Sequence, residues 1–236
     1  MKIVILIQAR LGSSRLPGKA ALDMHGMPLL ARVIARCRLA NSVSEICVAT
    51  SDSPGDEIVS RIARDAGATI FRGSLENVRQ RMLGAAERMG ADAFLRVTGD
   101  NPFTEPALID QLVAEKQAHP QCPYLVHDLT EAVYGTAAEL VDVQVLKTSL
   151  ETLPAAGREH VTTGIAQRAD ARVLTPPVAL RDTELSLTVD TLEQYQSVWR
   201  LMERYGSGVG ALAGIIRAWR DAGEDKEAFT TRPRAE

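Results

Sequence analysis

A short apolar strand that runs directly into a basic, glycine-rich loop constrains this chain more than any other feature. Residues 2–7 read Lys-Ile-Val-Ile-Leu-Ile, and residues 8–19 read Gln-Ala-Arg-Leu-Gly-Ser-Ser-Arg-Leu-Pro-Gly-Lys. An apolar run rich in β-branched residues predicts a strand that is buried on both faces, as in a parallel sheet covered by helices. In an open α/β sheet, the loop at the carboxyl end of such a strand is the usual place for a nucleotide.

The loop itself has the chemistry of an anion site. It carries Arg10, Arg15 and Lys19, and no carboxylate precedes Asp23. Glycine and serine let backbone N–H groups turn toward a ligand, and concave sets of such groups bind anions. We therefore predict a triphosphate-binding loop, although the same residues also make ordinary turns with a solvated basic face. The loop matches neither G-x-x-x-x-G-K-[ST] nor G-x-G-x-x-G, so its composition indicates phosphate without identifying the enzyme.

The composition fits one globular domain. The 236 residues are 45% hydrophobic and 24% charged, which suits a single α/β domain over 1–224, followed by a polar tail at 225–236 that we expect to fray. The net charge of −3 gives no basic excess that would favour a nucleic-acid partner. The first apolar run is too short to span a membrane and lacks a cleavage-site pattern, so we expect a cytoplasmic protein. Cys37, Cys47 and Cys122 form no C-x-x-C pair and suit reduced thiols.

Strands and helices alternate along the first hundred residues. Apolar β-type runs at 45–50, 68–71 and 93–97 follow the first strand, and runs with helical spacing lie between them at 28–37, 56–66 and 75–89, the last with Ser74 as its N-cap. This alternation predicts a three-layer α/β/α sandwich around a mixed, mostly parallel sheet. Two further segments, at 123–127 and 135–140, are weaker strand candidates.

Two aspartates follow predicted strands and are candidate metal ligands. Asp100 comes after the strand at 93–97, and Asp190 comes after an alternating strand at 184–189. Carboxylates at the strand ends lie at the same edge as the basic loop and can hold Mg²⁺, a hard cation that prefers oxygen ligands. Each also has a simpler interpretation: Gly-Asp-Asn-Pro at 99–102 is good turn chemistry, and Asp190 with Glu193 can form an N-cap and capping box.

Three stretches resemble one family of enzymes. The loop at 8–19 is similar to R-x-x-S-x-R-L-P-G-K of the 3-deoxy-manno-octulosonate cytidylyltransferases, which are related to the acylneuraminate enzymes. It is more similar to Q-A-R-x-G-S-x-R-L-P-G-K of the spore-coat polysaccharide cytidylyltransferase-like family. Residues 91–102 resemble that family's A-D-x-x-x-R-V-T-G-D-x-P, and residues 187–193 resemble L-T-V-D-T-x-E. The chain departs from the pattern at 103–105, where Phe-Thr-Glu stands in place of Leu-Ile-Asp.

The resemblance implies a Rossmann-like nucleotidyltransferase fold of the GT-A-like kind and a Mg²⁺-dependent cytidylyltransferase. Such an enzyme transfers CMP from CTP to an acidic small-molecule acceptor, a sugar acid or a phosphonate, and releases pyrophosphate. Relatives are often homodimers. Carried over by position, the catalytic residues are Arg10, Lys19, Asp100 and Asp190, and the last two are the Mg²⁺ ligands.

The remaining site residues fall into two groups. The nucleotide group comprises the basic loop and the segment after the third predicted strand, whose backbone can contact a pyrimidine edge: Gln8, Ala9, Arg10, Gly12, Ser13, Arg15, Lys19, Arg72, Gly73 and Ser74. The acceptor group rests on matches to G-T-x-x-E-V and R-E-H-V-T and on the turn after the fourth strand: Asn101, Glu139, Arg158 and His160. A lone glutamate in a strand is also a common salt-bridge partner, and a helical histidine is often structural.

Two other functions remain open from the residues. A glycosyltransferase of related architecture would consume an activated sugar, but such enzymes often carry D-x-D, and Asp-Asn-Pro at 100–102 lacks that spacing. A nucleotide-binding regulator without catalysis would bind CTP and not turn it over, which the retained cations and both aspartates argue against.

Overall fold

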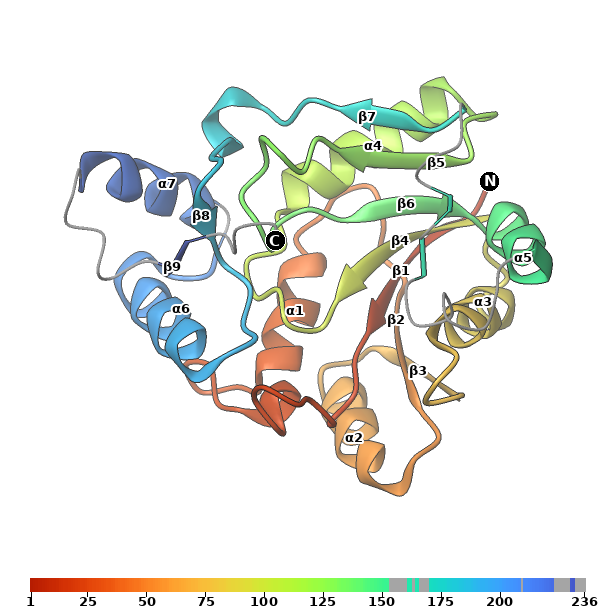
Figure 1. The fold of residues 1–236 in the computed structure, drawn as a ribbon, viewed down its shortest axis with the longest axis horizontal. Coiled ribbons are helices and arrows are strands. Elements are labelled where there is room, and N and C mark those ends of the chain that lie inside the picture. Colours follow the sequence, from red (N-terminus) through yellow and green to blue (C-terminus); the bar gives the residue numbers. More distant parts are fainter. Residues whose placement is uncertain (153–160, 163, 166–169, 209, 223–229, 232–236) are drawn as a thin grey trace.

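A seven-stranded sheet forms the centre of the molecule (Figure 1). The computed structural model describes residues 1–152, 161–162, 164–165, 170–208, 210–222 and 230–231. The strand order is β3-β2-β1-β4-β6-β5-β7, and β6 is antiparallel to both of its neighbours, whereas the other pairs are parallel. The predicted mixed, mostly parallel sheet is therefore confirmed. The strands are β1 Ile3–Gln8, β2 Ile46–Ser51, β3 Thr69–Gly73, β4 Ala93–Thr98, β5 Tyr124–His127, β6 Glu139–Asp142 and β7 Arg172–Leu174.

Helices cover both faces of this sheet, which confirms the three layers. Along β1, Ile5 and Ile7 pack into one apolar cluster, whereas Val4 and Leu6 pack into another, and none of the four is exposed to solvent. Burial on both faces explains why the strand is apolar at consecutive positions. The first cluster contains α1 Leu29–Cys37, α2 Glu57–Asp65 and α4 Pro106–Ala118; the second contains α3 Val78–Arg88 and α5 Val143–Thr152.

The pairing of β1 and β4 brings two loops together at one sheet edge. Gln8 is in register with Thr98, and the Gly99 N–H donates to the Gln8 carbonyl at 2.9 Å. A Cβ at Gly99 would lie 2.9 Å from the Cβ of Ala9 and 3.1 Å from the Gln8 oxygen, closer than such atoms approach. Glycine at 99 thus allows the loop that carries Asp100 to lie directly against the basic loop.

A third apolar cluster lies to one side of the main sheet (Figure 1). Buried Arg36 joins it to the rest of the molecule, because its guanidinium binds Glu105 at 2.8 Å and also the carbonyls of Ser207 and Gly208. The Val189 N–H donates to the Asp100 carbonyl at 2.9 Å, so the chain before Asp190 runs beside the end of β4. The cluster takes side chains from α6 Leu192–Tyr205, α7 Ala211–Asp221 and β8 Leu185–Ser186, and β8 pairs with β9 Thr230–Thr231. Short 3-10 turns lie at Lys19–Ala21, Pro54–Asp56 and Val178–Leu180.

Two predicted helix caps are wrong by one to three residues. The helix expected from 75 begins at Val78, with Asn77 as its N-cap, and Ser74 instead accepts a hydrogen bond from the Asn77 N–H. The capping box expected at Asp190 is formed by Thr191 and Gln194. In both cases a neighbouring polar residue competes for the cap, and side-chain type alone does not distinguish them. Of the tail at 225–236, the structure describes residues 230–231, which pair with β8. No described helix is long and apolar enough to cross a membrane.

Candidate active site

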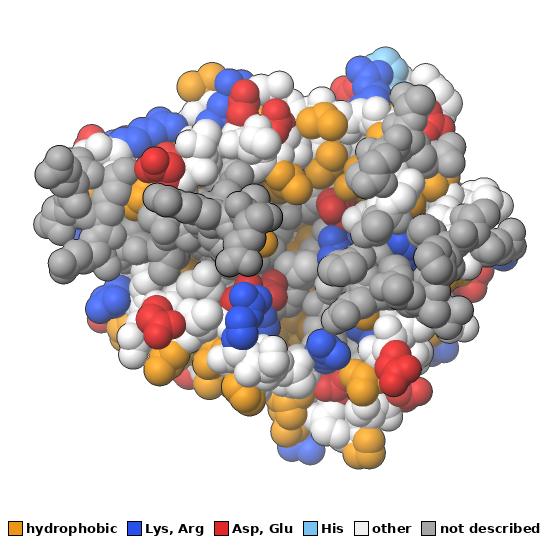
Figure 2. Space-filling view, in the orientation of Figure 1, with side chains coloured by type: hydrophobic (Ala, Val, Ile, Leu, Met, Phe, Trp, Pro, Cys, Tyr) orange, Lys and Arg blue, Asp and Glu red, His pale blue; other side chains and the backbone are white. Residues whose placement is uncertain are grey.

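A cavity of about 250 Å³ lies where β1 and β4 end. Figure 2 shows this face of the molecule hollowed near its centre, with basic and acidic side chains at the edge of the hollow. Most of the predicted nucleotide-binding residues converge there, and residues that the sequence analysis did not select, Arg81 and Thr98 among them, join them. The described lining is Gln8, Ala9, Arg10, Gly12, Ser13, Ser14, Arg15, Lys19, Ala20, Val78, Arg81, Thr98, Gly99, Asp100 and Asp190.

Lys19 links the two predicted metal ligands. Its Nζ lies 2.7 Å from Asp100 Oδ2 and 2.8 Å from Asp190 Oδ1, and it donates to the Val189 carbonyl at 3.1 Å. Burial alone would lower the pKa of Lys19, but the two carboxylates outweigh it and raise the pKa above its ordinary value. Residues that are 90 positions apart thus meet at one ammonium group. The Arg15 guanidinium adds a second cation, 3.0 Å from Asp190 Oδ1.

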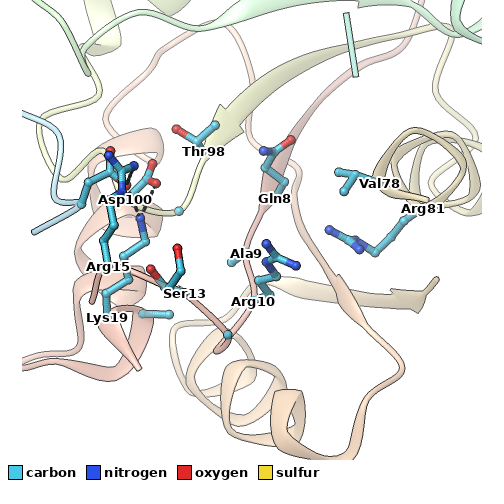
Figure 3. Close-up of a pocket in the computed structure, with 15 residues that line it drawn as sticks. Gln8, Ala9, Arg10, Ser13, Arg15, Lys19, Val78, Arg81, Thr98 and Asp100 are labelled. Atoms are coloured by element: carbon cyan, nitrogen blue, oxygen red, sulfur yellow. Dashed lines mark hydrogen bonds and ion pairs between the residues drawn. The ribbon is translucent and has the colours of Figure 1, made fainter. Parts of the chain in front are cut away.

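At the other end of the cavity, Arg10 and Arg81 point toward one another (Figure 3). Burial lowers the pKa of Arg81; nearby Asp56 opposes this effect, and Arg10 adds to it as a like charge. Arg81 is held in place because its Nη1 donates to the carbonyls of Ser74 and Leu75 at 2.5 and 3.3 Å. Two guanidinium groups that face each other across a cavity favour an anion between them.

Asp56, which the sequence analysis did not select, holds the basic loop by a hydrogen bond to its backbone. It is 3% exposed, and its Oδ1 accepts the Leu11 N–H at 2.6 Å. Its Oδ2 accepts the Ser51 N–H at 3.2 Å and the Ser51 hydroxyl. One buried carboxylate therefore ties the loop after β1 to the end of β2. Asp56 belongs to Asp-Ser-Pro-Gly-Asp, which looks like an ordinary turn in the sequence, so no local signal distinguishes it.

The end of β3 and Ser74, which follows it, lie beside the first cavity, which we call the nucleotide cavity because most of the predicted nucleotide-binding residues line it. Arg72 donates to the carbonyls of Ser51 and Ser53 at 3.1 and 2.8 Å and pairs with Glu57, so its guanidinium fixes the loop after β2. Gly73 and Ser74 line a neighbouring cavity of about 620 Å³, which Arg81 also lines. Among the described linings, none of these three predicted base contacts faces the cavity that holds Lys19; their role stays a prediction.

A further cavity, of about 380 Å³, adjoins the first, and we call it the second cavity. Arg15, Thr98, Asp100 and Asp190 line both, so the carboxylate pair stands at their junction. Two predicted acceptor residues, Asn101 and Glu139, line the second cavity, whereas Arg158 and His160 fall outside the described residues.

Glu139 is a salt-bridge partner inside the second cavity. Its Oε2 lies 2.8 Å from Arg96 Nη1, and its Oε1 accepts the Thr162 hydroxyl at 3.3 Å. Arg96 also donates through Nε to Gln8 Oε1 at 3.0 Å, which connects this pair to the first cavity. Arg96 itself was missed, because an arginine inside the strand at 93–97 gives no hint that it faces a ligand site.

The carboxylate pair suits a magnesium ion. No cluster of three or more His, Cys, Asp and Glu side chains is found among the described residues. Mg²⁺ commonly uses only one or two protein carboxylates, with waters and substrate phosphates completing its shell. Asp100 and Asp190 already converge on one cationic group, Lys19 Nζ, and Asp190 is not needed as a helix cap, since Thr191 and Gln194 form the capping box. The donor set therefore fits the ion.

Comparisons with known proteins agree with this geometry. A family model described as cytidylyltransferase matches residues 4–199. The spore coat polysaccharide biosynthesis protein SpsF of Bacillus subtilis is 30% identical over 239 residues, which cover 96% of this chain and 98% of that protein. A 3-deoxy-manno-octulosonate cytidylyltransferase of Geobacter sulfurreducens is 36% identical over 122 residues, which cover 51% of this chain and 47% of that enzyme.

Solved structures show the same fold. A cytidylyltransferase from Leptospira borgpetersenii superposes with a TM-score of 0.86 at 24% identity and covers 100% of both chains. A CMP:2-keto-3-deoxy-manno-octonic acid synthetase complexed with CTP superposes with a TM-score of 0.65 at 20% identity, over 86% of this chain and 99% of that one. The expected nucleotidyltransferase fold is thereby confirmed.

Proposed function

The chain belongs to the cytidylyltransferase family and is a CTP-dependent nucleotidyltransferase, and from this premise we propose that it transfers CMP to an acidic small-molecule acceptor, a sugar acid or a phosphonate, with Mg²⁺ held by Asp100 and Asp190. The observation that carries the proposal is the junction of two cavities at that carboxylate pair. One cavity has the cations that a triphosphate needs, and the other is left for the acceptor.

The residues of the first cavity would hold CTP for in-line attack. Arg10 and Arg81 face one another and suit a phosphate group between them. Lys19 and Arg15 lie beside the carboxylates at the other end, where they would neutralise charge as it moves onto the departing pyrophosphate. Lys19 has a flexible four-carbon stem, so its ammonium can turn from the carboxylates to a phosphate oxygen when the nucleotide enters.

The reaction joins an acceptor oxygen to the α-phosphorus of CTP and breaks the bond between the α- and β-phosphates. Most of its barrier lies in bringing two anions together, so positioning and charge neutralisation dominate. When bound, Mg²⁺ supplies Lewis-acid charge neutralisation and a template for both reactants. The second cavity would place the acceptor against Asp100 and Asp190 from the side opposite to the Arg10 and Arg81 pair.

The proposal extends to the protein's state in the cell. We propose a cytoplasmic homodimer. The homodimer is what the resemblance of the sequence implies, and the cytoplasm suits three cysteines that are free and buried. Burial raises the pKa of Cys37 to about 12 and that of Cys47 to about 11, so both thiols are protonated at neutral pH. Light scattering on a size-exclusion column would measure the oligomeric state.

The decisive experiment is a matrix of substrates. The protein is incubated with ATP, CTP, GTP or UTP, with and without Mg²⁺, against sugar acids and phosphonates, and pyrophosphate is measured. We expect release with CTP, Mg²⁺ and one class of acceptor. Release that is independent of an acceptor, or equal with all four nucleotides, would contradict the proposal. A glycosyltransferase would release no pyrophosphate, and a regulator would bind CTP without turnover.

A further inference from the structure

The second cavity has an apolar wall that the conversion of CTP does not account for. Leu129 and Tyr134 line it and are 48% and 41% exposed, so two large apolar side chains lie uncovered at one cavity. Small apolar residues of the same segment, Ala132 and Val133, line the cavity beside them, and its lining also includes the charged residues Arg15, Arg96, Asp100, Glu139 and Asp190. A cavity with one apolar wall and a few convergent polar groups is typical of a small-molecule site.

The backbone holds Tyr134 rigidly in this wall. Its N–H donates to the Leu185 carbonyl at 3.1 Å, and its carbonyl accepts the Leu187 N–H at 2.8 Å. Gly135 follows at φ +87°, and a Cβ there would lie 2.7 Å from the Thr188 backbone nitrogen. The loop therefore packs backbone to backbone against the segment that leads to Asp190, and these contacts fix the backbone that carries the Tyr134 ring.

Leu129 is fixed by a separate turn. The Asp128 carboxylate accepts the Thr130 N–H at 2.8 Å and the Thr130 hydroxyl at 2.6 Å, and the Asp128 carbonyl accepts the Ala132 N–H at 2.9 Å. These bonds close a tight turn around Leu129, whose side chain stays at the cavity. Two independent local structures thus present large apolar side chains to one space.

We propose that Leu129 and Tyr134 form an apolar platform on which the carbon skeleton of the acceptor lies, and that this platform makes the enzyme prefer acceptors with an extended carbon face to compact ones. The inference rests on the proposed function, because it assigns the second cavity to the acceptor. Its volume of about 380 Å³ falls within the range of small-molecule sites, roughly 300–1,000 Å³. A ring of a sugar acid covers such a platform, whereas a two-carbon phosphonate leaves it in contact with water.

The test compares two acceptor probes, 3-deoxy-manno-octulosonate and 2-hydroxyethylphosphonate, on four proteins. These are the wild type, Tyr134→Ala, Tyr134→Phe and Leu129→Ala. Burial of ring carbons against the platform leads us to expect that Tyr134→Ala raises the KM for the cyclic probe about tenfold and Leu129→Ala about threefold to fivefold. The KM for CTP and the KM for the compact probe should change less than twofold, and Tyr134→Phe should stay within threefold of the wild type. Ile58→Ala, at an exposed apolar position on α2, is the matched control.

A second measurement separates the platform from the proposed function. Binding of 3-deoxy-manno-octulosonate is followed by calorimetry without CTP, so no turnover is needed. Weaker binding to Tyr134→Ala, with Tyr134→Phe unchanged, supports the platform even if no acceptor releases pyrophosphate. If Tyr134→Ala and Leu129→Ala leave both the binding and the ratio of kcat/KM for the two probes unchanged, the platform is wrong, whatever the outcome of the nucleotide matrix.

Discussion

The two cavities share four lining residues and differ in nearly everything else. The nucleotide cavity is built mainly from one continuous loop, residues 8–20, and it carries four basic side chains, those of Arg10, Arg15, Lys19 and Arg81. The second cavity, which we propose for the acceptor and call the acceptor cavity, is assembled from β4, the loop before β6 and the segment before α6, and its lining includes the exposed Leu129 and Tyr134. Asp100 and Asp190 belong to both.

From this difference we infer that the nucleotide cavity holds the triphosphate, whereas the acceptor cavity determines which acceptor is used. A triphosphate is the same anion in every turnover, so a single rigid loop tied down by Asp56 can hold it. The cavity that we propose for the acceptor is made of separate segments of the chain, which can change independently. Substitutions at shared residues should therefore affect both substrates, whereas substitutions in one cavity should affect one substrate.

The largest effect is expected for Asp190→Asn, because Asp190 lines both cavities and contacts Lys19 and Arg15. The change keeps the size of the side chain and removes its charge, so the proposed Mg²⁺ loses one of its two carboxylate ligands, and Lys19 and Arg15 lose a charged partner. We expect kcat/KM for CTP and for the acceptor to fall together by roughly 10²–10³. Pyrophosphate release measures the rate, and thermal melting checks that the fold is retained.

The matched control is Glu193→Gln, three residues further along the chain. Glu193 is an exposed carboxylate in the first turn of α6, and it lines neither cavity among the described residues. Its rate should stay within twofold of the wild type. If Asp190→Asn lowers kcat/KM for only one of the two substrates, then Asp190 does not act on both cavities, and the division of the site into shared and separate residues is wrong.

The sequence predicted the nucleotide cavity better than the acceptor cavity, for a physical reason. The loop residues are neighbours in the sequence, so they lie together at the end of one strand. Asp100 and Asp190 could be predicted because each follows a predicted strand. Arg81, Asp56 and Arg96 were missed because each also interacts with residues far away in the sequence: Arg81 with Arg10, Asp56 with Leu11, and Arg96 with Gln8 and Glu139. A buried carboxylate or guanidinium has no local pattern that separates it from a surface charge.

The fold followed the same rule. The alternation of apolar β-type runs with helical runs predicted β1 to β4 and their helices. β1, β2 and β4 are mostly buried between two helical layers, whereas β3, at the edge of the sheet, is only partly buried. The middle of the chain gave weaker signals, since β5 and β6 are four residues long and β6 reverses direction. The guanidinium of Arg72, at the end of β3, binds the neighbouring loop, so the predicted base contact of this segment stays a prediction for its backbone groups.

A smaller and one-sided effect is expected for Arg81→Gln. Arg81 faces Arg10 across the nucleotide cavity and is absent from the described lining of the acceptor cavity. Loss of a hydrogen bond to a charged group costs about 1.5–3 kcal/mol, so the KM for CTP should rise roughly 10- to 100-fold while the acceptor KM changes little. Arg88→Gln, at an exposed position on the same helix, serves as the control. An equal rise in both KM values would show that α3 also shapes the acceptor cavity.

The smallest effect is expected for Arg96→Gln, and we expect it to arise from the unpaired charge of Glu139. In the wild type Arg96 neutralises the Glu139 carboxylate at 2.8 Å, so removal of the guanidinium leaves an unpaired negative charge in the wall that faces an acidic acceptor. We expect the acceptor KM to rise about threefold to tenfold, because like charges repel in a partly buried site. The double variant with Glu139→Gln is neutral and should recover most of this loss, whereas the KM for CTP should change less than twofold even though Arg96 also contacts Gln8. If the double variant is no better than Arg96→Gln, then Arg96 contacts the acceptor itself and does not act only by neutralising Glu139.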